Sequence, residues 1–71
     1  MSTAAITIDP ETMSGIPVFT GTRVPIQSLW DYLGTGETLD EFLENFPSVR
    51  REQALEVLAL ASELVNRASA V

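Results

Sequence analysis

The amino-acid sequence predicts a mainly α-helical fold in which a short N-terminal β-hairpin or arm precedes three helices. β-Branched and turn-forming residues dominate the first third of the chain, and apolar residues then recur at helical spacing. With 71 residues there is room for a single domain. The expected segments are a frayed tail over 1–5, a β arm and hairpin over 6–26, and helices over 25–34, 38–46 and 49–68.

Ile6-Thr7-Ile8 alternates β-forming residues, and Asp9-Pro10 ends the run. This pattern predicts a short strand with two alternative roles. It either packs on its own domain or forms an edge strand that pairs with another chain, because an unpaired edge is a template for association. Ile6 and Ile8 are therefore candidate contacts for a second subunit or a partner.

The stretch from Gly15 to Ile26 reads GIPVFTGTRVPI and predicts a hairpin that leads into a helix. Gly21 lies where a tight turn requires a positive φ. Pro17 suits the beginning or the solvent edge of the first strand, and Pro25 suits the start of a helix. Arg23 is expected to pair with a carboxylate such as Asp31 or Asp9, or with a partner.

The first helix is predicted from Ile26, Leu29, Trp30 and Leu33, which fall on one face. Gly34 is expected to end it in the left-handed conformation. Trp30 is more often a core anchor at such a position than a ligand-stacking residue.

The second helix should begin at Thr38, which forms the capping-box pattern with Glu41, and end before Pro47. The third helix is longer and should start near Ser48 or Arg50. Leu55 and Leu60 lie outside or at the border of its main apolar stripe, so we expect apolar surface left over for a partner chain.

Composition excludes several classes of function. The chain has no His, Cys or Lys, so the usual nucleophiles, bases and zinc ligands are missing, and we predict no enzymatic activity and no cofactor. Asp40, Glu41 and Glu44 could in principle bind a hard cation, but this spacing is more typical of a solvated helix face, and no metal site is predicted. No apolar run reaches the length of a membrane span, and no signal pattern opens the chain, so the cytoplasm is the expected location.

Ten acidic residues and four arginines give a net charge of −6, which disfavours nucleic acid and favours a basic partner. Helices two and three are separated by a tight turn, as in a helix-turn-helix. Arg50, Arg51 and Gln53 then lie at the start of the third helix, where base-reading residues would be. Exposed helix residues without such a role are the alternative.

The residues Gly15, Pro17, Gly21, Thr22, Arg23 and Pro25 resemble the GxPxxxGTRxPV signature of the domain-of-unknown-function family 433. The similarity continues through Leu33-Gly34-Thr35-Gly36, the segment 38–47, and Leu58-Ala59-Leu60-Ala61. It implies a homeodomain-like three-helix fold and a role as the antitoxin of a type II toxin–antitoxin pair, in the manner of VapB-like proteins. The implied partner is a PIN-like ribonuclease toxin.

The chain departs from this family's pattern where the third helix begins. Members often carry Leu-Thr there, with an acidic residue three positions after the Thr as its capping partner. Here Val49-Arg50 and Gln53 occupy these places, which makes Ser48 the candidate N-cap.

Three hypotheses follow. The protein is an antitoxin that neutralises a toxin, or a dimeric helix-turn-helix regulator that binds operator DNA, or a dimeric structural adaptor without a toxin. The first two can hold together, as an antitoxin that also regulates its own operon. A homodimer is expected in each case, because a chain of this size buries a limited fraction of its surface.

Overall fold

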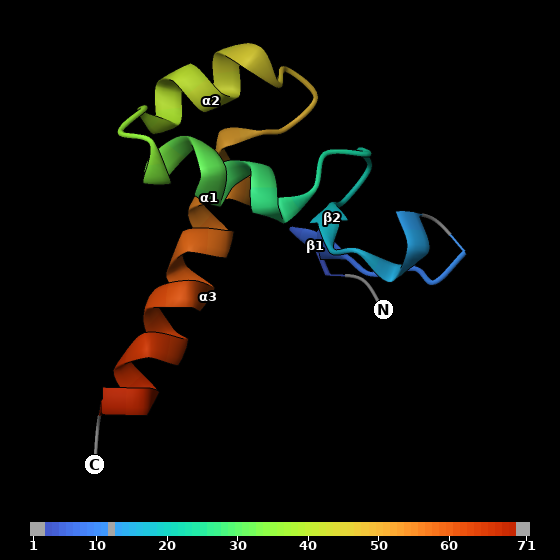
Figure 1. Ribbon diagram of the computed structural model, residues 1–71. Coiled ribbons are helices and arrows are strands. Elements are labelled where there is room, and N and C mark those ends of the chain that lie inside the picture. The colour runs from blue at the N-terminus through green and yellow to red at the C-terminus, as the bar shows by residue number, and fades with distance from the viewer. Residues whose placement is uncertain (1–2, 12, 70–71) are drawn as a thin grey trace.

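A two-stranded antiparallel sheet and three α-helices make up the protein in the computed structural model, which describes residues 3–11 and 13–69 (Figure 1). The predicted fold class is thereby confirmed. In chain order, the elements are β1 (Ile6–Thr7), the 3₁₀ turn η1 (Met13–Gly15), β2 (Val18–Phe19), α1 (Ile26–Gly34), α2 (Leu39–Asn45) and α3 (Arg51–Ser69).

Strand β2 lies between two neighbours. On one side it pairs with β1, in the register Ile6↔Phe19. On the other side it is joined by a single bridge to Pro25, and the Phe19 N–H donates to the Val24 carbonyl at 3.0 Å. The arm thus pairs within its own chain, which is the first of the two alternatives that its sequence left open.

The tail expected to fray at 1–5 is ordered over the part that the structure describes. Ala5 is 1% exposed and belongs to the core, and its carbonyl accepts from the Thr20 N–H at 2.9 Å. The hydroxyl of Thr20 donates to the Thr3 carbonyl at 2.8 Å. These contacts come from a turn fifteen or more residues later in the chain, so local composition gave no sign of them. Met1 and Ser2 lie outside the described residues.

Helix α1 begins one residue later than predicted, because Pro25 has extended backbone and acts as the N-cap. Its end differs from the expectation as well. Gly34 is still helical, and Gly36, with φ of 87°, is the left-handed residue. The Glu37 N–H donates to the Tyr32 carbonyl and the Gly36 N–H to the Leu33 carbonyl, which is the Schellman pattern. With two glycines two residues apart, periodicity alone could not tell which one ends the helix.

Helix α2 has the predicted capping box. The Thr38 hydroxyl accepts from the Glu41 N–H at 3.1 Å, and the Glu41 carboxylate accepts from the Thr38 N–H at 2.9 Å. Helix α3 begins at Arg51, and Ser48 lies in the preceding turn, so the expectation of Ser48 as N-cap is wrong. Arg50 occupies that position, and its N–H donates to Oε1 of Gln53 at 3.0 Å.

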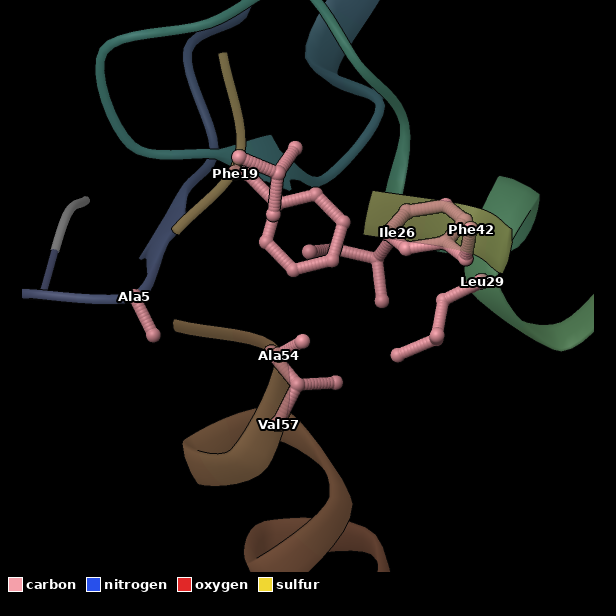
Figure 2. Packing of buried hydrophobic residues seen from close by; sticks show 8 residues of the cluster. Ala5, Phe19, Ile26, Leu29, Phe42, Ala54 and Val57 are labelled. Carbon is pink, nitrogen blue, oxygen red and sulfur yellow. The ribbon is translucent and has the colours of Figure 1, made fainter. Parts of the chain in front are cut away.

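The core is small and draws on every part of the chain (Figure 2). Its largest buried side chains come from β2, α1 and α2, namely Phe19, Leu29 and Phe42. Ala54 and Val57 close it from the first turns of α3.

The remainder of α3 runs away from this body (Figure 1). The radius of gyration is 12.6 Å, against about 11 Å expected for a compact chain of this length. The helix therefore ends well outside the core that its first turns complete.

Candidate binding surfaces

A groove of about 530 Å³ opens between the N-terminal arm, α1 and α3. We call it the apolar groove. Its lining residues are almost all apolar: Ile6, Ile8, Ile16, Pro17, Ile26, Trp30, Val57, Leu60, Ala61 and Leu64, with Thr3 and Gln27 as the polar exceptions. Among residues 3–11 and 13–69, no charged side chain lines this groove, although the net charge of the chain is −6.

The residues predicted to contact a second chain separate into two groups. Ile6, Ile8 and Leu60 come together in the apolar groove, although Leu60 on α3 lies more than fifty residues after the other two. Leu55 does not line it and is 49% exposed elsewhere on α3. Trp30 packs against the core and also lines the groove, so it has a structural role and an accessible face.

Four of the six signature residues, Pro17, Gly21, Thr22 and Pro25, lie in the turn after β2 or in the backbone pairing that joins β2 to the start of α1. Gly21 has φ of 81° in a turn closed by the Thr22 N–H, which donates to the Phe19 carbonyl at 3.0 Å. The Thr22 hydroxyl donates to the same carbonyl at 2.8 Å and accepts from the Val24 N–H at 3.0 Å. The Pro17 carbonyl accepts from the Ile26 N–H at 3.0 Å, while Gly15 ends η1.

Arg23 does not form the ion pair that was expected. It is exposed, and among residues 3–11 and 13–69 it has no salt bridge with Asp31, Asp9 or any other carboxylate. Asp31 instead accepts from the Gln27 amide at 3.1 Å. The turn is fixed by the Thr22 hydroxyl, which leaves the guanidinium of Arg23 in solvent.

Of the three residues proposed to read DNA, two are engaged within the protein. Gln53 is 4% exposed, and its amide nitrogen donates to the Thr20 carbonyl at 2.9 Å. The guanidinium of Arg51 pairs with the carboxylate of Asp40 on α2. Arg50 is exposed at the start of α3 and forms no salt bridge with a described residue.

Gln53 has a structural role that the sequence did not indicate, because its side chain joins α3 to the N-terminal part of the chain. Its two amide atoms serve different ends: Oε1 holds the Arg50 N–H at the helix start, and Nε2 binds the turn after β2. In a capping box, the residue three positions after the N-cap accepts a hydrogen bond from the N-cap N–H. Gln53 occupies this position, where the family's pattern has an acidic residue. The sequence interpretation passed over this cap, because it took the departure from the family's pattern as a reason to prefer Ser48, and the bond to Thr20 had no sequence signal.

Six exposed carboxylates belong to neighbouring segments of the chain, and we call this set the acidic surface. Its exposed carboxylates belong to the loop before α2, to α2 itself and to the first turns of α3: Glu37, Asp40, Glu41, Glu44, Glu52 and Glu56. An exposed ion pair between Arg51 and Asp40 links α2 to the first residue of α3. Among the described residues, no group of three or more His, Cys, Asp or Glu side chains is placed to hold a metal ion.

Comparison with known protein families shows to which family the chain belongs. The family described as "Protein of unknown function (DUF433)" matches residues 6–61. This chain belongs to the DUF433 family. The match ends within α3, so the arm, the hairpin, α1, α2 and the first turns of α3 make up the DUF433 domain.

The signature that carries the DUF433 resemblance is thus the scaffold of the hairpin. No curated protein and no solved structure matched the chain. Within the described part of the chain, no helix has the length and apolar character needed to span a membrane.

Proposed function

We propose that this DUF433 protein is a non-enzymatic antitoxin that binds and neutralises a PIN-like ribonuclease toxin. The acidic surface is the observation that carries the proposal. A nuclease that binds RNA needs a basic cleft, and an acidic protein complements such a cleft and associates with it quickly. The chain has no His, Cys or Lys to support catalysis of its own.

A helix-turn-helix regulator that binds operator DNA is the second candidate. The short turn between α2 and α3 and the exposed Arg50 favour it. The engagement of Gln53 and Arg51 within the protein weighs against direct base reading, because a side chain already bonded to the backbone or to a carboxylate is a poor probe of base edges. The net charge of −6 points in the same direction.

Co-expression with a PIN-like protein encoded by a neighbouring gene tests the proposal. The expected result is a stable complex in which RNA cleavage by the toxin is suppressed in proportion to the amount of this protein. Complex formation should weaken as salt rises, since the attraction is electrostatic. A toxin that cleaves RNA equally well with and without this protein would rule the proposal out.

Charge-reversal variants test whether the toxin binds at the acidic surface. Glu44 belongs to the acidic surface, and its side chain has no salt bridge with any described residue, so Glu44→Lys should slow association about three- to tenfold at low salt. Glu11→Lys is the matched control, because it makes the same change on an exposed side chain of the N-terminal arm. Equal effects of the two variants would show that net charge matters and the acidic surface does not.

For the DNA alternative, the measurement is affinity for the upstream DNA over a range of salt. Specific binding with a steep salt dependence that Arg50→Ala reduces would support a regulator.

A further inference from the structure

The apolar stripe that attaches α3 to the core continues past the point where the core ends. Ala54 and Val57 are buried, and the same three- and four-residue steps lead on to Ala61, Leu64 and Val65. Leu64 and Val65 are 65% and 66% exposed. In Figure 1 this part of α3 has no other element of the chain beside it.

The apolar groove and this helix end are complementary in chemistry. The groove offers an apolar surface without a charged lining residue, and the helix offers an apolar stripe without a cover. The groove and the helix end lie on the same chain. In a two-fold symmetric dimer, the helix end of each copy can therefore cover the groove of the other.

We propose that the apolar groove is a homodimer interface, in which α3 of a second copy lies antiparallel to α3 and places its Leu64 and Val65 in the groove. The helices cross near Ala61, where the small side chain lets the backbones approach. Leu60, Ala61 and Leu64 then lie on the shared face, with Trp30 and Ile8 as the outer walls of each groove.

Charge supports a second copy as the occupant. Glu56 and Arg67 are eleven residues apart, about three helical turns, so they lie along one side of α3. Antiparallel crossing at Ala61 brings position 67 of one helix level with position 55 of the other, beside Glu56. Arg67 pairs with Glu63 on its own helix at 2.7 Å and stays 72% exposed, so in this arrangement its guanidinium also lies near Glu56 of the other copy, once at each end of the apolar contact.

The charge distribution along the chain points the same way. Residues 57–69 contain one acidic and one basic residue, Glu63 and Arg67, so this half of α3 is neutral. The net charge of −6 arises entirely from the rest of the chain. The surface brought together is therefore the one at which two copies of an acidic protein repel each other least.

This inference concerns a different surface from the acidic one assigned to the toxin. Its failure would leave the proposed function untouched, and the failure of the proposed function would leave the dimer untouched.

Sedimentation equilibrium of the full chain over about 1 to 500 µM tests the proposal. We expect a monomer–dimer equilibrium, with a concentration-dependent blue shift in the fluorescence of Trp30, which is the one tryptophan of the chain and lines the groove. Leu64→Glu should weaken association about tenfold or more, because it places a charge in the apolar contact.

Leu55→Glu is the matched control on the same helix. Leu55 is 49% exposed, lies off the groove, and should leave the dimer intact. The helical signal in circular dichroism should stay the same in both variants, since neither side chain is buried within one chain.

A charge-reversal pair tests the antiparallel arrangement. Arg67→Glu and Glu56→Arg should each weaken the dimer, and the double variant should recover it. A wild-type monomer over the whole range, equal effects of Leu64→Glu and Leu55→Glu, or a dimer that charge reversal does not affect would each overturn the proposal. A groove that is filled by a different protein while the chain stays monomeric would overturn it too.

Discussion

The amide nitrogen of Gln53 donates a hydrogen bond of 2.9 Å to the carbonyl oxygen of Thr20, which ties the first turn of α3 to the turn that follows β2. The same nitrogen lies 3.4 Å from the Ala4 carbonyl, and Oε1 caps the helix start. One side chain therefore connects the arm, the hairpin and the last helix.

We predict that Gln53→Ala lowers the free energy of unfolding by about 2–4 kcal/mol. The substitution leaves the partly buried Thr20 carbonyl without this donor and removes the cap at Arg50. Chemical denaturation followed by circular dichroism measures the change. Gln27→Ala is the control, since Gln27 is exposed and bonds only to Asp31; its effect should stay near 0.5 kcal/mol or below.

If Gln53 instead read DNA bases, Gln53→Ala would weaken DNA binding while the stability stayed at the wild-type value. That outcome would contradict the structural role assigned to this amide.

The two glycines at the end of α1 should respond to alanine with opposite signs. Gly34 is helical and a Cβ there meets no atom within 4 Å, so Gly34→Ala should stabilise the protein by about 0.5–1 kcal/mol. Gly36 has φ of 87°, which strains any L side chain, so Gly36→Ala should destabilise it by about 1 kcal/mol or more. Thermal unfolding of both variants checks the assignment, and equal signs would show that the Schellman ending is wrong.

The capping box of α2 gives a third test. Thr38→Ala removes the acceptor for the Glu41 N–H and should lower the stability by about 1 kcal/mol. Thr38→Ser retains a hydroxyl in the same place and should recover most of this loss. If serine were no better than alanine in urea denaturation, the hydroxyl would not be the stabilising group.

Phe42 is the centre of an aromatic cluster and is 0% exposed. Its ring centroid lies 4.9 Å from that of Phe46, 5.5 Å from that of Tyr32 and 5.9 Å from that of Phe19. Phe42→Ala should cost about 3–5 kcal/mol, which is most of the stability expected for a chain of this length.

This variant should therefore show a broad or absent thermal transition, whereas Phe42→Leu should still unfold cooperatively at a lower temperature. A sharp, wild-type transition for Phe42→Ala would mean that the cluster is not the centre of the core.

The sequence predicted those features that depend on neighbours along the chain. The stripe of α1 and the capping box at Thr38 are patterns of three- and four-residue spacing, and the structure contains both. The positive φ of Gly21 follows from a tight turn between two short β segments, and it too was predicted from local residues.

Features that depend on distant parts of the chain were missed. The burial of Ala5 and the role of Gln53 result from contacts between the arm, the turn and α3, and nothing near either residue announces them. Arg23 was expected to pair with a carboxylate, but the hydrogen bonds of the Thr22 hydroxyl already fix the turn. Of the residues predicted to contact a partner chain, Ile6, Ile8 and Leu60 lie together in the apolar groove. The chain that would cover them stays a prediction.

The burial of Ala5 has a consequence for the kinetics of folding. Helices α1 and α2 contact each other over short stretches of chain, but the arm must meet α3 across a separation of 49 residues between Ala4 and Gln53. Closing so long a loop is slow compared with forming local helical contacts. The arm should therefore dock late and detach first, and its amides should exchange with solvent deuterium faster than those of α1.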